Sequence, residues 1–163
     1  MTTYKTHIEW LTCDESGHEY PFPDLGSQSY GQFVLRSKNQ RFSYCDFVQD
    51  LTLNEVSKML SQHKISSVIN SYKKSDIFQD IYGPVCCDLD EFGDSYKIDS
   101  LLKCPYCQNP DTPEHDLALS YDRSSAEIPY VAHEKWDRLT DAEKVARVDQ
   151  ALREMGHLDP SPK

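Results

Sequence analysis

The stretch LLKCPYCQNP, residues 101–110, holds two cysteines, Cys104 and Cys107, with two residues between them. This spacing serves either a zinc site or a redox centre. Zinc binds four ligands in a tetrahedron with sulfur atoms about 3.8 Å apart, and a tight turn between two cysteines provides that separation. A redox centre needs its first cysteine at the N-terminus of a helix, where the helix dipole favours the thiolate. Pro110 and Pro113 follow Cys107 closely and exclude a helix there. The stretch therefore predicts half of a zinc site, around which the rest of the fold is organised.

The six residues CPYCQN resemble the knuckle of a zinc ribbon, with a proline after the first cysteine and a polar residue after the second. This resemblance implies a bound zinc ion with Cys104 and Cys107 as two of its ligands. The letters CPYC also resemble the glutaredoxin motif, which implies a thiol–disulfide oxidoreductase as the alternative. A zinc ribbon supplies a second pair of this kind, and the chain has none. The remaining ligands must therefore come singly from other segments.

The remaining candidate ligands are four cysteines and two histidines: Cys13, Cys45, Cys86, Cys87, His18 and His115. Cys86 and Cys87 are adjacent, so in an extended segment their side chains diverge and only one of them can face the metal. Cys87 opens the acidic turn DLDEFGD, whereas Cys86 follows the apolar Val85. We therefore expect Cys87 to face the metal and Cys86 to face the core.

Cys13 is the expected fourth ligand, because it lies where a predicted strand changes into a loop. His18 or His115 could take its place, whereas Cys45 lies within a predicted strand and is expected to pack as a small apolar residue. The predicted ligands of the zinc ion are Cys13, Cys87, Cys104 and Cys107. Four thiolates leave no open position for water, so the predicted site is structural and not catalytic.

Strands are predicted by alternating apolar and polar residues. YKTHIEWLTC, residues 4–13, has this pattern. Residues 31–47 hold two further strand-forming runs joined by KNQ, which predicts a β-hairpin in the same sheet. AEIPYVAH, residues 126–133, predicts a strand at a sheet edge because it contains Pro129. Short strands are also expected in ISSVINSY and GDSYKIDS, and a long loop in DESGHEYPFPDLG (residues 65–72, 93–100 and 14–26).

The clearest helix is predicted for LTDAEKVARVDQALREMG, residues 139–156. Thr140 and Glu143 have the spacing of a capping box, and Gly156 supplies a C-terminal stop. Its apolar face is formed by residues at spacings of three and four: Val145, Val148, Leu152 and Met155. Trp136, just before this helix, is expected to anchor it.

A second main helix is predicted for LTLNEVSKMLSQH, residues 51–63, where Thr52 and Glu55 have the same capping-box spacing. SDIFQDIYG predicts a short helix or turn that ends at Gly83. The expected fold is α+β, with a small antiparallel sheet, two main helices and a loop region that contains the zinc knuckle. Residues 1–156 are expected to form one domain, and residues 157–163 a flexible tail.

Composition limits the possible partners. The formal net charge of −10 disfavours nucleic acid and anionic membranes, because binding to either depends on lysine and arginine. The sequence shows no signal peptide and no apolar run of about 20 residues, so we expect a cytoplasmic protein. Six cysteines in a reducing compartment favour metal binding or catalysis over disulfides.

Apart from CPYC, the sequence offers no clear catalytic motif. HEKWD at 133–137 lacks the second histidine of a zinc-protease helix, and no phosphate-binding glycine loop is present. The leading hypothesis is a non-catalytic binding protein that acts through protein–protein contact. In size, charge and lack of catalytic motifs it is similar to bacterial toxin-immunity proteins, which implies an acidic surface that contacts a basic protein.

Overall fold

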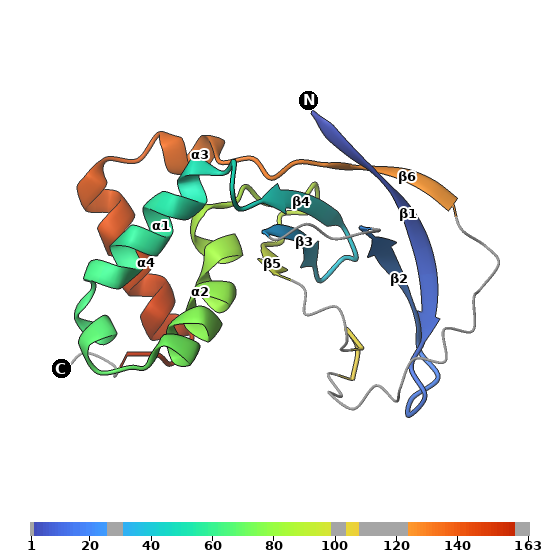
Figure 1. Ribbon diagram of the computed structural model, residues 1–163, viewed down its shortest axis with the longest axis horizontal. Helices are drawn as coiled ribbons and strands as arrows, with labels where there is room; N and C mark the ends of the chain where they lie inside the picture. The colour runs from blue at the N-terminus through green and yellow to red at the C-terminus, as the bar shows by residue number, and fades with distance from the viewer. Residues whose placement is uncertain (1, 26–30, 99–103, 108–123, 159–163) are drawn as a thin grey trace.

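The structure is a computed structural model that describes residues 2–25, 31–98, 104–107 and 124–158. Within these residues the chain forms two antiparallel sheets of three strands and four α-helices, which confirms the predicted α+β class (Figure 1). The elements in chain order are β1 (Thr3–Thr12), β2 (Glu19–Asp24), β3 (Gln32–Ser37), β4 (Phe42–Asp46), α1 (Leu51–Gln62), a 3₁₀ turn (Lys64–Ser67), α2 (Ser71–Cys86), β5 (Tyr96–Ile98), β6 (Ser124–Pro129), α3 (Glu134–Asp137) and α4 (Asp141–Glu154).

The single predicted sheet is replaced by two, with strand orders β2-β1-β6 and β4-β3-β5. β1 pairs with β6 from Thr3 to Ile8 and with β2 from His7 to Thr12. Both edges of β1 are therefore already paired. The hairpin of β3 and β4 pairs with β5 instead, through β3. A parallel bridge between Tyr44 and Tyr130, just after β6, links the second sheet to the first.

β2 lies in the segment that was predicted to be a long loop. Its two prolines, Pro21 and Pro23, are accommodated because β2 is an edge strand, where a missing backbone N–H interrupts little pairing. Tyr20 and Leu25 in and beside β2 are buried. These two residues therefore pack inward.

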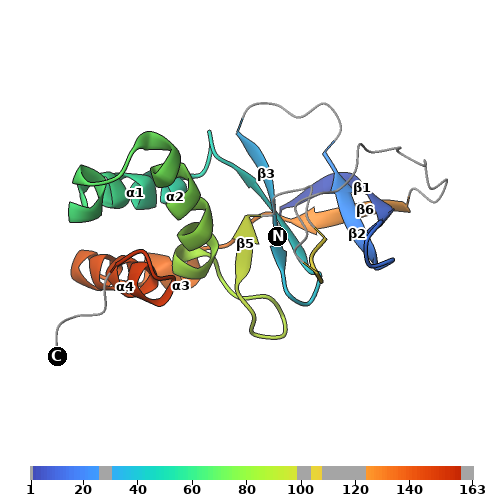
Figure 2. The ribbon, with the colours of Figure 1, turned by 90° about the horizontal axis from the view of Figure 1, so that it is seen from below.

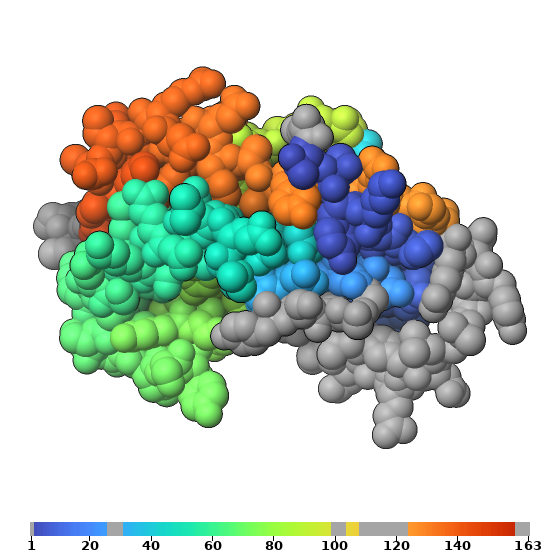
Figure 3. Space-filling model, turned by 45° about the horizontal axis from the view of Figure 1, so that its top comes forward, coloured from blue at the N-terminus to red at the C-terminus, as the bar shows by residue number. Residues whose placement is uncertain are grey.

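Helices α1, α2 and α4 pack together at one end of the molecule and the two sheets occupy the other (Figure 2). In the face shown in Figure 3, the helices and β1 likewise lie at opposite ends. The largest hydrophobic core lies among the helices and includes the fully buried Leu35 of β3. Trp136 of α3 is the predicted anchor and is only 1% exposed. Its indole Nε1 donates to Glu55 Oε2 at 2.7 Å, which fixes α3 to α1.

The capping box predicted for α1 is wrong. Asp50 is the N-cap, and its side chain accepts a hydrogen bond from the backbone N–H of Leu53. Glu55 is engaged elsewhere, since its carboxylate binds Trp136 and lies 2.9 Å from the ammonium of Lys144. A stronger acceptor two residues earlier therefore sets the start of the helix.

α2 is longer than predicted and replaces the strand expected at residues 65–72. The 3₁₀ turn covers the start of that segment, and α2 begins after the N-cap Asn70, whose Oδ1 accepts from the N–H of Lys73 at 2.8 Å. At its other end α2 continues through Gly83 and Pro84. A Cβ on Gly83 would lie 2.0 Å from the carbonyl oxygen of Tyr96 in β5. This glycine is therefore required for the close crossing of β5 over α2 and does not stop the helix.

α4 agrees with its prediction at both ends, whereas Val145 of the predicted apolar face is 50% exposed. Thr140 and Glu143 form a complete capping box, and Gly156 has a positive φ of 73° just after the helix. Leu158 packs against the core, and residues 159–163 of the predicted tail lie outside the described residues. Among the residues that the structure describes, none of the helices combines the length and the apolar character needed to cross a membrane.

Candidate metal centre

The turn between β1 and β2 brings Cys13 and His18 together. Cys13 directly follows β1, and His18 directly precedes β2. The backbone N–H of Cys13 donates to the carbonyl of His18 at 2.8 Å, and the N–H of Gly17 donates to the carbonyl of Cys13 at 2.7 Å. Gly17 has a φ of 67°, a left-handed conformation that glycine adopts without a steric penalty. The turn thus pairs the backbones of Cys13 and His18 at the tip of the hairpin.

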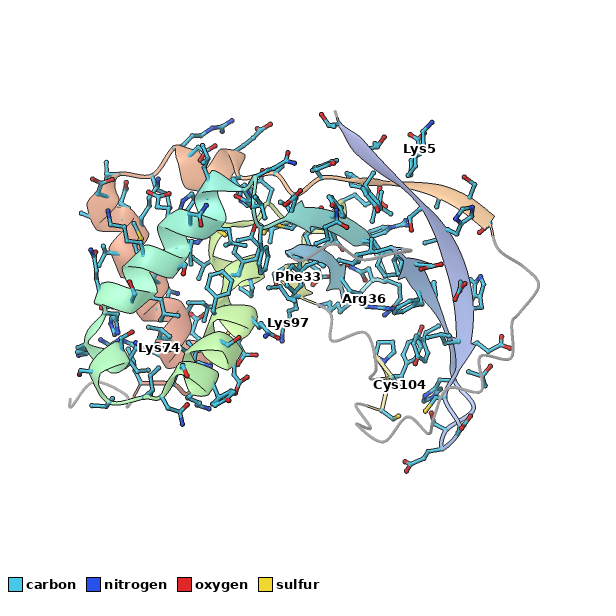
Figure 4. The ribbon with its side chains drawn as sticks, viewed as in Figure 1. Lys5, Phe33, Arg36, Lys74, Lys97 and Cys104 are labelled. Carbon is cyan, nitrogen blue, oxygen red and sulfur yellow. The ribbon has the colours of Figure 1, made fainter. Side chains whose placement is uncertain are left out.

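The second half of the centre is the turn from Cys104 to Cys107, and Cys104 lies beside the hairpin tip (Figure 4). The sulfur atoms of Cys13, Cys104 and Cys107 all lie within 4.8 Å of one another. Cys13 Sγ is 3.6 Å from Cys107 Sγ, and Cys104 Sγ is 3.8 Å from His18 Nδ1. Ligands around a tetrahedral zinc ion are about 3.8 Å apart when Zn–S is about 2.3 Å. The three sulfur atoms therefore have spacings that suit one zinc ion, and His18 Nδ1 approaches the cluster from the side of Cys104 without lying within 4.8 Å of all three sulfurs.

The cluster of sulfur atoms is partly buried and partly exposed. Cys13, Cys104 and Tyr20 are buried together, whereas Cys107 is exposed. Ser16 Oγ lies 2.7 Å from His18 Nδ1 and 3.6 Å from Cys107 Sγ. Hydrogen bonds from Ser16 lower the pKa of the Cys13 thiol to about 7. This favours the thiolate form, which is the form that binds zinc.

Three of the four predicted ligands are brought together: Cys13, Cys104 and Cys107. The fourth prediction, Cys87, is not supported by the geometry, because its sulfur groups with Cys86 and His133 instead. The physical reason is the length of α2, which extends to Cys86 and carries both adjacent cysteines into the helical core.

His18 was an alternative to Cys13; the structure places Cys13 in the sulfur cluster and His18 Nδ1 3.8 Å from Cys104 Sγ. The signal for it in the sequence is the spacing of a cysteine and a histidine around Gly17, which closes a turn. Cys45, the other cysteine alternative, is fully buried in β4. His115 lies outside the described residues.

The second group, Cys86, Cys87 and His133, has donors of a different kind. His133 Nδ1 lies 2.7 Å from the carbonyl oxygen of Cys86, and Nε2 lies 3.1 Å from Asp50 Oδ2. Burial opposes a charge on the ring, but the hydrogen bonds to Asp50 and to the Cys86 carbonyl outweigh it and raise the pKa of His133 to about 9. Both ring nitrogens therefore carry protons at neutral pH and have no lone pair for a metal.

The thiol of Cys86 is also unsuited to metal binding, because it donates to the carbonyl of Tyr82 at 3.0 Å and burial raises its pKa well above the ordinary value. Asp50 accepts hydrogen bonds from the Tyr82 hydroxyl, from His133 and from the N–H of Leu53. Burial alone would raise the pKa of Asp50, but these bonds hold it well below its usual range. His133 and Asp50 thus form a buried ion pair, which joins α1, α2 and the segment before α3.

Comparisons of this chain with protein-family models, curated proteins and solved structures found no match. The donor set is therefore interpreted from its own chemistry. Three thiolates and one imidazole form a closed set of soft ligands, which is typical of structural zinc. Magnesium and calcium prefer oxygen ligands.

Proposed function

We propose that this chain is a non-catalytic zinc-binding protein that acts through protein–protein contact, with zinc held by Cys13, His18, Cys104 and Cys107. The observation that carries this proposal is the convergence of three sulfur atoms from two turns far apart in the sequence, with His18 Nδ1 3.8 Å from one of them, Cys104 Sγ. Four protein ligands leave no position for a substrate or an activated water, so the ion supports the fold.

The expected contribution of the metal to stability is large. Structural zinc binds to small peptides with about 10–16 kcal/mol, which is comparable to the whole stability of a domain at about 5–15 kcal/mol. The ion would link residues that are 94 positions apart, as between Cys13 and Cys107. Among the described residues, few apolar side chains surround Cys13 and Cys104, so the metal would be the main link between the hairpin tip and the second turn.

A protein partner with a basic surface is the expected target, as for an immunity or inhibitor protein. The net charge of −10 supports this expectation, and Asp14, Glu15 and Glu19 are exposed beside the proposed centre. Tyr106, between the two cysteines of the second turn, is 52% exposed, and tyrosine is enriched at protein interfaces. The six cysteines are all thiols, which suits a reducing compartment such as the cytoplasm.

The competing proposal is a thiol–disulfide oxidoreductase that uses Cys104 and Cys107. In such enzymes the first cysteine is an accessible nucleophile at a helix N-terminus. Here Cys104 is 0% exposed, and the residues from Cys104 to Cys107 form a turn. The burial pattern therefore favours the zinc proposal. Alkylation distinguishes the two, because zinc-bound thiolates react only after a chelator removes the metal, whereas a redox thiol reacts at once.

Metal analysis of protein purified without chelators tests the zinc proposal. We expect about one zinc per chain for the wild type and for Cys87→Ser, and less than a tenth of that for Cys104→Ser. His18→Ala should retain zinc more weakly, with at least a tenfold loss of affinity. Loss of zinc from Cys87→Ser, or a metal-free wild type, would contradict the proposed ligand set.

Affinity capture with the zinc-loaded protein tests the proposed partner. We expect a basic protein that is released when ionic strength rises from about 0.05 M to about 0.5 M, since screening shortens the reach of charge–charge attraction. A matched bait with Tyr106→Ala should recover less of the same protein. Recovery of no protein by the wild type, or of an acidic one that salt does not release, would count against this part of the proposal.

A further inference from the structure

Two sulfur atoms of the proposed centre are arranged for disulfide formation. Cys13 Sγ and Cys107 Sγ lie 3.6 Å apart. A disulfide bond is about 2.05 Å long, so the two sulfurs need to approach by only about 1.5 Å. Cys107 is exposed, and Cys13 is buried directly behind it. An oxidant in solution can therefore reach one sulfur, while the second is positioned to react with the product.

The other sulfur atoms in the described residues lack this combination. Cys104 is 0% exposed and faces His18. Cys86 and Cys87 are close together but buried in the helical core, and the Cys86 thiol is hydrogen-bonded to a backbone carbonyl. Cys45 is buried beside Asp50 and Tyr82. Among the described cysteines, Cys13 and Cys107 are thus the pair in which one sulfur is exposed to an oxidant and the other is close to it.

We propose that hydrogen peroxide joins Cys13 and Cys107 in a disulfide and thereby releases the bound zinc. The release of zinc rests on the function proposed above, whereas closure of the disulfide depends only on the positions of the two sulfurs. Peroxide would thus replace the zinc link at the hairpin tip by a disulfide, and a dithiol reductant would reduce this disulfide again.

The reaction has two balanced steps. The Cys107 thiolate attacks one peroxide oxygen, the O–O bond breaks, and hydroxide leaves and takes a proton to form water; Cys107 is then a sulfenic acid. The Cys13 thiolate attacks the Cys107 sulfur, the S–O bond breaks, and the second hydroxide leaves and is protonated. The two sulfurs lose two electrons and peroxide gains them, so two thiolates, two protons and one peroxide give one disulfide and two waters.

Zinc release follows from the ligands that the disulfide consumes. A disulfide sulfur carries no negative charge and is a poor zinc ligand, because the thiolate is the binding form. Only Cys104 and His18 would remain, and two ligands do not complete a tetrahedral site. The hairpin tip and the second turn would then be joined covalently and no longer through the metal.

The experiment treats the zinc-loaded full chain with increasing hydrogen peroxide and follows two quantities: zinc released to a colorimetric chelator, and disulfide-linked peptides identified by mass spectrometry. We expect about one zinc released per disulfide formed, and recovery of both thiols after dithiothreitol. Cys107→His is the informative variant, because an imidazole can still bind zinc but cannot form a disulfide. It should retain at least five times more zinc than the wild type at equal peroxide, and Cys87→Ser should behave as the wild type.

A disulfide between Cys104 and Cys107, or zinc release from Cys107→His as fast as from the wild type, would overturn this assignment. Failure of the zinc proposal gives a different result, because the protein would then contain no zinc before peroxide is added. In that case peptide mapping still decides whether Cys13 and Cys107 form the disulfide.

Discussion

Replacing His133 by glutamine tests the buried ion pair in the helical core. The imidazole lies between Asp50 and the carbonyl of Cys86, and its pKa of about 9 exceeds the ordinary value of 6.5. A group whose pKa is raised by folding stabilises the folded state fully below its unfolded pKa, and this contribution is lost as the pH rises through the folded pKa. The difference of about 2.5 pH units, at about 1.4 kcal/mol each, corresponds to about 3–4 kcal/mol. Asp50 is ionised in both states throughout this window, so it does not change the slope.

The contribution of His133 to the unfolding free energy of the wild type should therefore fall by about 3 kcal/mol between pH 6.5 and 9.5. His133→Gln should be less stable by about 3–5 kcal/mol at pH 6.5, because it leaves the Asp50 carboxylate without its charged partner. The stability difference between the two proteins should shrink by about 3 kcal/mol over this window, because the variant lacks the His133 contribution. Urea unfolding at constant free zinc measures both effects, and the thiols contribute equally to the two proteins. His7 is exposed on β1, so His7→Gln is a matched control that should change stability by less than about 0.5 kcal/mol. Equal slopes for the wild type and His133→Gln would refute the reasoning.

Three further substitutions test the helical core. Gly83→Ala would place a methyl group against the backbone of Tyr96 and should cost about 3 kcal/mol or more by urea unfolding, and an unchanged midpoint would exclude the close crossing of α2 and β5. Leu152→Ala removes a fully buried side chain of α4 and should cost about 2–5 kcal/mol with no change in zinc content, whereas a cost below about 1 kcal/mol would mean that this helix face is not packed. Thr140→Ala removes the N-cap of α4 and should lower stability by about 1 kcal/mol in thermal unfolding, with Thr2→Ala at an exposed position as a control; equal melting temperatures for the two variants would contradict the capping box.

Local signals in the sequence predicted the elements whose limits are set locally. The capping box of Thr140 and Glu143 and the stop at Gly156 mark α4 without reference to any other part of the chain. The hairpin of β3 and β4 was also predicted, because its alternating pattern and its turn residues lie within one short segment. These interactions need no knowledge of tertiary structure.

The errors arise where distant contacts decide the local structure. Gly83 resembles a helix stop, yet α2 continues through it because β5 needs that space. Cys87 resembled a ligand at the start of a turn, and the longer helix moves it into the core. β2 forms despite its two prolines because β1 offers it an edge position. None of these partners could be identified from sequence spacing.

For the candidate site, the sequence indicated Cys13, Cys104 and Cys107 through a spacing and a strand end. It treated His18 as a substitute for Cys13, since it could not show that a glycine turn sets the two residues side by side. The distinction matters because it changes the ligand set from four sulfurs to three sulfurs and one nitrogen.

X-ray absorption spectroscopy at the zinc edge tests the central claim most directly. A centre formed by Cys13, His18, Cys104 and Cys107 predicts three sulfur neighbours at about 2.3 Å and one imidazole nitrogen at about 2.0–2.1 Å. Cys87→Ser should give the same spectrum, and His18→Ala should lose the imidazole contribution. A first shell of four sulfurs, or one dominated by oxygen, would contradict the account.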